Sequence, residues 1–195
     1  MSTYNAIRYN NPYANAGGLV LLSTQTASAS ASISFTSGIN STYKEYMFVF
    51  NNIHPATDDV DFQFNFSTDG GSNYNVTKTT TAFNTYHYES DAGTNLDYDT
   101  ARDLAQSTNY QDISRRTGNG NDESVSGYLH LFNPSDTNFV KHFIINTNGV
   151  HTLDISFSLF IAGYGNTTSA INAIDFKMPS GNIDDGTIQM FGVVS

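Results

Sequence analysis

The sequence contains no cysteine and no tryptophan, and charged residues make up only 13% of its 195 positions. Without cysteine the chain can form neither disulfide bonds nor thiolate metal sites, and it has no thiol nucleophile. Its longest apolar runs, such as residues 18–22, are far too short to span a bilayer. Residues 1–18 also lack the charged head and apolar stretch of a signal peptide. These absences exclude thiol chemistry and indicate no membrane-spanning segment.

Basic residues are scarce as well. Eight lysines and arginines stand against 18 acidic residues, which gives a formal net charge of −10. Binding to duplex nucleic acid depends mainly on basic side chains that displace counterions, so a surface of this average charge repels nucleic acid. There is also no run of basic residues that would attract an anionic membrane. We therefore expect neither nucleic acid nor a membrane as a partner.

Phenylalanine, tyrosine and small polar residues are abundant. The sequence has 14 Phe and 12 Tyr, and in several segments these aromatic residues alternate with polar ones. Such alternation is the pattern of a strand with one buried face. Residues 60–66 alternate in this way, whereas Tyr46, Phe48 and Phe50 alternate with the apolar Met47 and Val49, as in a central strand that is apolar on both faces. Asn, Ser, Thr and Gly supply turn residues between the segments. The pattern predicts an all-β chain, with one short helix expected at residues 100–106.

The number and spacing of these segments predict the architecture. We expect about nine strands, one of them within residues 23–36, joined by polar turns such as a hairpin turn at residues 69–71. Such a series of strands predicts an antiparallel two-sheet sandwich, with the jelly roll as the favoured connectivity. The expected organisation is one β-sandwich domain over residues 19–195, preceded by an extended N-terminal arm over residues 1–18.

Two segments without a strand pattern are candidates for contacts between subunits. In the arm, Tyr4, Tyr9 and Tyr13 lie among Asn and Ala with neither strand nor helix periodicity. Tyrosine is a common anchor of protein interfaces, so the arm is predicted to bind a neighbouring subunit; the alternative is a frayed terminus. Arg115 and Arg116 lie in a stretch rich in Gly and Asn, which is predicted to be an exposed, contact-making loop.

The sequence carries no signature of a known catalytic site. It has no phosphate-binding Gly-Lys loop, no dinucleotide-binding glycine triplet and no nucleophile elbow. No two histidines have the short spacing that fixes two metal ligands locally, although His87, His130 and His142 would converge if their strands were neighbours. The aspartate clusters match no calcium loop, which leaves a calcium ion held between loops as the alternative. We expect no catalytic residue, no metal site, no cofactor and no enzymatic activity.

Three tyrosines support a different interpretation of the surface. Tyr86, Tyr88 and Tyr110 could stack on sugar rings, as aromatic residues do in carbohydrate-binding sandwiches. They could equally be ordinary sheet residues, because tyrosine has a high strand propensity. The absence of tryptophan weakens the carbohydrate interpretation without removing it. These tyrosines are therefore the candidate glycan-stacking residues of an alternative function.

The C-terminal segment 176–193 has a recognisable form. It contains Ser-Gly-x-Ile, a turn, Gly-Thr-Ile, and a strand that ends in an aromatic-Gly-hydrophobic triplet, and segments within residues 46–74 add to this pattern. Together these segments resemble small virion structural proteins of tailed bacteriophages, of the type found in marine and cyanobacterial phages. The resemblance covers residues 43–75 and 124–195. It implies a β-sandwich that attaches to the head or the tail of the particle.

The resemblance implies a non-enzymatic role on the outer surface of the virion, after synthesis in the host cytoplasm. The first hypothesis is a capsid decoration (cement) protein that binds and stabilises the head shell, with the major capsid protein as partner and a homotrimer as the favoured assembly. The alternative is a tail-fibre, baseplate or receptor-binding module that recognises host surface glycan. The short chain, without stalk or coiled-coil heptads, favours decoration. A hydrolase on the same fold would need a converging pair of acidic side chains.

Overall fold

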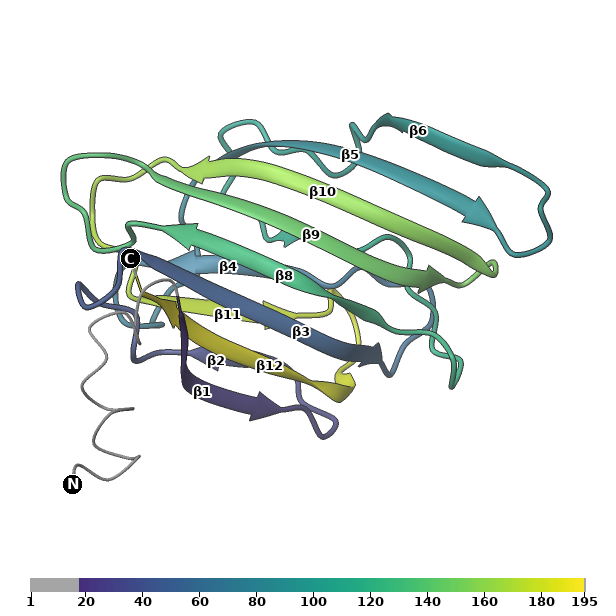
Figure 1. The fold of residues 1–195 in the computed structure, drawn as a ribbon, viewed down its shortest axis with the longest axis horizontal. Helices are drawn as coiled ribbons and strands as arrows, with labels where there is room; N and C mark the ends of the chain where they lie inside the picture. The colour runs from purple at the N-terminus through teal and green to yellow at the C-terminus, as the bar shows by residue number, and fades with distance from the viewer. Residues whose placement is uncertain (1–17, 195) are drawn as a thin grey trace, which may run out of the picture.

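The computed structural model describes residues 18–194, and all regular structure in that range is β-strand (Figure 1). Twelve strands form two antiparallel sheets, one of eight strands and one of four. The all-β, two-sheet antiparallel sandwich expected from the alternating apolar residues is therefore confirmed. The strands are β1 (Leu19–Thr26), β2 (Ile33–Phe35), β3 (Glu45–Pro55), β4 (Gln63–Ser67), β5 (Lys78–Tyr88), β6 (Thr94–Tyr98), β7 (Gln111–Asp112), β8 (Val125–Phe132), β9 (Lys141–His151), β10 (Ile155–Gly165), β11 (Ala173–Lys177) and β12 (Ile183–Val193).

Eight of the strands have the order of a jelly roll. The larger sheet has the order β1-β12-β3-β8-β9-β10-β5-β6, and the smaller sheet has the order β2-β11-β4-β7. The first four strands of the larger sheet and the four strands of the smaller one are the two sheets of a jelly roll, between which the chain crosses repeatedly. In Figure 1 the larger sheet lies in front, with β1 and β6 at opposite edges. The strand order therefore agrees with the expected connectivity.

Two inserted hairpins widen the larger sheet beyond this jelly roll. The hairpin β5–β6 is inserted between β4 and β7, and the hairpin β9–β10 between β8 and β11. Because β9 pairs with β8 and β10 pairs with β5, the two insertions continue the sheet without a break. Residues 99–117 cover the inner side of this extension, where Thr117 bridges to Val60 and to His151. The result is one outer face that runs across eight strands.

Phenylalanine rings fill the space between the two sheets. Alternate residues of a strand point to the same face, so Phe48 and Phe50 of β3 and Phe64 of β4 are all directed inward and fully buried. The ring of Phe176 on β11 lies 5.2 Å from that of Phe50 and 5.8 Å from that of Phe62. These ring pairs place Phe176 at the centre of the aromatic core, between the strands of both sheets.

The structure has twelve strands where about nine were expected, and the additional strands have identifiable physical origins. The segment 23–36, expected to be one strand, is divided between β1 in the larger sheet and β2 in the smaller one. Ala29, between them, adopts a left-handed φ of 50°. Strand β6 is exposed along its whole length, so it has no alternation of buried residues to reveal it. Strand β7 has only two residues, which is too short for a periodic signal.

Two further expectations are wrong. Residues 100–106 do not form a helix, because Arg102 turns inward to bind Asp61 and Asp99 and the segment becomes a series of turns. Residues 69–71 do form a turn with two left-handed glycines. This turn does not close a hairpin, however, since β4 and β5 belong to different sheets.

Candidate functional site

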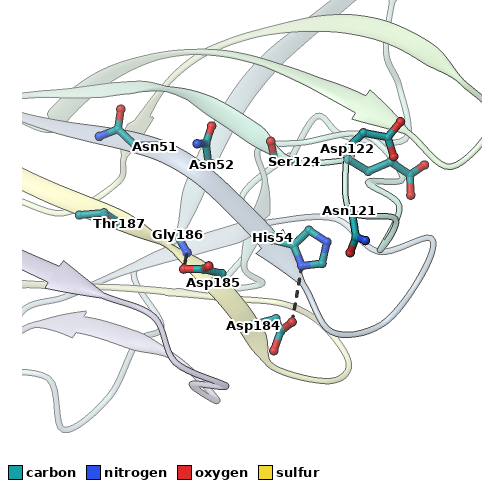
Figure 2. Close-up of a pocket in the computed structure, with 11 residues that line it drawn as sticks. Asn51, Asn52, His54, Asn121, Asp122, Ser124, Asp184, Asp185, Gly186 and Thr187 are labelled. Carbon is teal, nitrogen blue, oxygen red and sulfur yellow. Dashed lines mark hydrogen bonds and ion pairs between the residues drawn. The ribbon is translucent and has the colours of Figure 1, made fainter.

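A polar cleft of about 530 Å³ opens beside the end of β3 (Figure 2). The pairing of β3 with β12 shifts register twice between Ile183 and Thr187, and the pairing of β3 with β8 shifts between Phe50 and Ile53. At the same level Asn52 adopts a left-handed φ of 49°. Bulges of this kind bend a strand and redirect its side chains. The cleft is therefore produced by irregular pairing on both sides of β3.

His54 connects the two walls of the cleft. Its Nδ1 atom lies 3.7 Å from Oδ2 of Asp184 at the start of β12, toward which the ring points in Figure 2. Its Nε2 atom lies 3.1 Å from the carbonyl oxygen of Gly120 in the loop before β8. Because a carbonyl oxygen can only accept a hydrogen bond, Nε2 carries a proton and donates it. The histidine thereby holds this loop and β12 at a fixed separation.

Carboxylate and amide side chains dominate the lining of the cleft. Oδ1 of Asp185 accepts a hydrogen bond of 2.6 Å from the N–H of Gly186, and Oε2 of Glu123 accepts one of 2.5 Å from the N–H of Gly120. These backbone contacts fix the two carboxylates in place. The arrangement offers many hydrogen-bond acceptors, which suits a ligand that presents hydroxyl or cationic groups. The other polar side chains that line the cleft are Asn51, Asn52, Asn121, Asp122, Ser124, Asp184 and Thr187.

The histidines considered as metal ligands lie on separate strands and have other partners. His87 on β5 contacts Asp91 at 3.0 Å, while His130 on β8 contacts Glu45. The ring of His142 on β9 packs against Tyr164. Among residues 18–194, no three His, Asp or Glu side chains are grouped so that they could hold a metal ion. The same part of the chain contains no helix long and apolar enough to cross a membrane.

The two candidate loop arginines have different surroundings. Arg115 is half-buried, donates a hydrogen bond of 2.5 Å to Asn84 and lies 4.8 Å from the centre of the Tyr86 ring. Arg116 is exposed and binds both carboxylate oxygens of Asp59, at 2.6 and 2.8 Å. Arg115 therefore secures the loop to β5, and Arg116 is the one that faces solvent. The candidate arm residues Tyr4, Tyr9 and Tyr13 lie outside the described residues.

The three candidate glycan-stacking tyrosines do not form one platform. Tyr86 and Tyr88 lie near the end of β5, with ring centres 5.9 Å apart in an edge-to-face arrangement. Tyr110 lies beside β7 in the other sheet, where its hydroxyl donates a hydrogen bond of 2.9 Å to Asp175. Lys177 places its Nζ atom 4.1 Å from the centre of the Tyr110 ring and so occupies one ring face. Burial and the neighbouring Asp175 also raise the pKa of Tyr110.

Four apolar side chains and one histidine form a row across the strands on the outer face of the larger sheet, where they are partly or fully exposed. Cross-strand partners point to the same face, and the pairing links Leu21 to Phe191, Phe191 to Met47, Met47 to His130, and His130 to Ile144. Both ends of this first row are open to solvent, since Leu21 is 52% exposed and Ile144 is 50% exposed. We call this line of five side chains the first outer row.

A second outer row lies toward the β6 edge of the same face. It consists of Tyr98 on β6, Phe83 on β5 and Phe160 on β10, which are cross-strand partners in that order. The rings of Phe83 and Phe160 stack with their centres 4.9 Å apart. Sequence reasoning missed both rows, because their members come from distant segments and become neighbours only through the strand register. The available sequence signal was an apolar residue at the solvent-facing alternate positions of a predicted strand.

No protein-family model matches the sequence, and no curated protein matches it. One solved structure, a structural genomics protein of unknown function from Bacteroides ovatus, aligns with 54% of this chain at 6% identity and a TM-score of 0.29. The alignment spans 45% of the length of that protein.

Proposed function

We propose that this chain is a non-enzymatic structural protein of a bacteriophage particle, and specifically a decoration protein that binds the outside of the head shell. The observation that supports this proposal most directly is the outer face of the larger sheet with its two outer rows. Soluble proteins seldom leave contiguous apolar surface open to water, and such surface commonly marks a site of protein association. The resemblance of residues 43–75 and 124–195 to small virion proteins supports the same role.

Several properties suit the sandwich to this work. An outer face that spans eight hydrogen-bonded strands is rigid, so binding costs little additional ordering of the protein. Many copies that bind the same shell gain stability through multivalency, and closure by rotational symmetry would give the trimer expected for the assembly. The net charge of −10 is compatible with a position outside the shell, away from packaged nucleic acid.

Charged substitutions in the first outer row test the proposal. With Leu21 and Ile144 both replaced by Asp, we expect binding of the purified protein to expanded heads to weaken by about tenfold or more, because the charges would have to be buried against the shell. Cosedimentation of heads with increasing protein concentration measures this affinity.

Deletion of residues 1–18 is expected to weaken binding as well, if the arm contacts the shell or a neighbouring copy.

The matched control is Leu153→Asp. Leu153 is 54% exposed in the turn between β9 and β10, outside both outer rows, so this variant should bind like the wild type. Circular dichroism of all variants shows whether the sheets are retained. If the folded double variant occupied heads normally, the outer face would not be the binding surface. If the wild type did not bind heads, the proposal that the protein is a decoration protein would be rejected.

The polar cleft favours the second candidate function, a tail or receptor-binding module for host glycan. Amide and carboxylate side chains are the groups that hydrogen-bond sugar hydroxyls, and the cleft volume is within the usual range for small-ligand sites. If this function is correct, the wild type binds particular glycans on an array and Asn121→Ala loses most of that signal. Asn138→Ala, an exposed asparagine in another loop, serves as the control. An array without any binding rejects this alternative.

A further inference from the structure

A buried lysine at the start of β5 meets a buried asparagine on the side of β4 that faces away from the aromatic core. Asn65 lies on β4 between two inward-pointing phenylalanines, so its side chain projects to the opposite side of the strand. Lys78, the first residue of β5, reaches it with its Nζ atom 2.5 Å from Oδ1 of Asn65. Both residues are completely buried. Among residues 18–194, no carboxylate lies within ion-pair distance of Lys78, which is unusual for a buried lysine.

The lysine is prepared to act as a nucleophile. Within the described part of the chain its Nζ atom has one other hydrogen-bond partner, the carbonyl oxygen of Val76 at 3.0 Å. Burial lowers the pKa of Lys78 from its usual value of 10.5 to about 7. A substantial fraction of the side chain is therefore a neutral amine near neutral pH, and a neutral amine carries the lone pair that a nucleophile needs.

The amide of Asn65 is held in a geometry that assists attack on its carbon. Besides the lysine, the N–H of Phe66 donates a hydrogen bond of 2.9 Å to Oδ1. Donors at this oxygen stabilise the negative charge that develops when the carbonyl is attacked. The Nδ2 atom donates to the carbonyl oxygens of Tyr74 at 2.7 Å and Thr108 at 2.9 Å. These contacts orient the carbonyl toward the lysine and the leaving nitrogen away from it.

We propose that Lys78 and Asn65 form an intramolecular isopeptide bond. The lone pair of Nζ forms a bond to Cγ of Asn65, and the bond between Cγ and Nδ2 breaks. A proton lost by Nζ is transferred to Nδ2, which leaves as ammonia. The products are a secondary amide and one molecule of ammonia, so the reaction consumes no oxidant, reductant or other reactant. The new bond would join β4 of the smaller sheet covalently to β5 of the larger one.

This inference is independent of the proposed virion role, because it follows from the contacts of the two residues alone. Its consequence is mechanical. The strands β4 and β5 belong to different sheets and do not pair with each other. A covalent link would prevent the smaller sheet from separating from the hairpin extension of the larger one, whatever the partner of the protein.

Mass spectrometry of the purified, folded full-length chain tests the bond. The intact mass should be lower than that of the sequence by one ammonia. Between Lys44 and Arg102 the only tryptic cleavage site is Lys78, and an amide at Nζ blocks it. We therefore expect one peptide covering residues 45–102 that lacks one ammonia, with no fragment ions from breaks between positions 65 and 78. A full intact mass with separate peptides 45–78 and 79–102, unchanged after several days of incubation, would overturn the proposal.

Three variants locate the reaction. Lys78→Met and Asn65→Ala should each show the full intact mass, with the loss of ammonia abolished. The matched control is Lys141→Met, since Lys141 is also fully buried but, among the residues that the structure describes, its Nζ atom hydrogen-bonds only to the main-chain carbonyls of Phe139 and Thr167. This variant should keep the mass deficit. A deficit that persists in Asn65→Ala would contradict the assignment, and the wild-type peptide map decides the question even if a variant fails to fold.

Discussion

Replacing Phe176 by Ala is expected to lower the free energy of unfolding by about 3–5 kcal/mol. Phe176 is fully buried on β11, and its ring packs against rings from both sheets. Truncation would remove its burial and leave a cavity that the surrounding rings of β3 and β4 cannot fill without leaving their rotamers. Since small domains are stable by only about 5–15 kcal/mol, the loss is a large fraction of the total. Urea unfolding followed by circular dichroism measures it.

Two companion variants make this result interpretable. Phe139→Ala removes a ring that is 71% exposed in the loop before β9, so its effect should be within about 0.5 kcal/mol of zero. Phe176→Leu keeps much of the buried volume and should cost clearly less than Phe176→Ala, which keeps the comparison measurable if the alanine variant does not fold. Similar losses for Phe139→Ala and Phe176→Ala would contradict a core centred on Phe176.

Replacing Arg102 by Met is expected to destabilise the protein by about 3–5 kcal/mol at neutral pH. The guanidinium is buried, donates to both oxygens of Asp61 at 3.0 and 2.9 Å, and donates to Asp99 at 3.2 Å. Burial alone would lower the pKa of Arg102, but the neighbouring carboxylates outweigh this effect and raise it. Loss of the cation would leave these poorly solvated carboxylates without their ion-pair partner.

The destabilisation by Arg102→Met should shrink as the pH falls. Burial and the charge of Asp61 already raise the pKa of nearby Asp112, while Arg102 opposes that rise. Without the arginine the pKa of Asp112 rises further. A carboxyl group whose pKa is higher in the folded state than in the unfolded state lowers stability most above its folded pKa, and this penalty disappears as the pH falls below its unfolded pKa. Unfolding curves at about pH 7 and about pH 4 measure the difference.

The control for this prediction is Arg116→Met. Arg116 also binds an aspartate with two hydrogen bonds, but its side chain is 48% exposed. Exposed ion pairs contribute only about 0–1 kcal/mol, so this variant should be nearly as stable as the wild type. If Arg102→Met proved equally harmless, the buried charge cluster would not be what holds residues 99–117 against the extension of the larger sheet.

The parts of the fold that sequence reasoning predicted are those with a local period. Tyr46, Phe48 and Phe50 repeat every second residue, and burial of one strand face is what such a repeat produces. Strand β6 could not be predicted in this way, because it is exposed throughout and lies at the edge of the sheet, paired with β5. The place of the two inserted hairpins in the larger sheet could not be predicted from sequence either, since the pairing of β10 with β5 depends on residues that are distant in sequence.

The candidate sites were less predictable than the fold. Arg115 has the sequence context of an exposed loop, yet it packs on Tyr86, because residues 99–117 fold back over the extension of the larger sheet. Predicting the contact between Lys78 and Asn65 would have required knowledge of how the chain passes from one sheet to the other. No pattern within either segment reveals that path. The first outer row similarly depends on strand register. In each case the missing information was long-range pairing.

The central claim is that this jelly roll acts by adhesion through the outer face of its larger sheet. A cryo-EM map of intact particles that contain the chain tests this claim most directly. We expect density for the sandwich on the outside of the head, with Leu21, Met47 and Ile144 buried against the shell or against a neighbouring copy. Absence of the chain from the particle, or an outer face turned toward solvent, would contradict it.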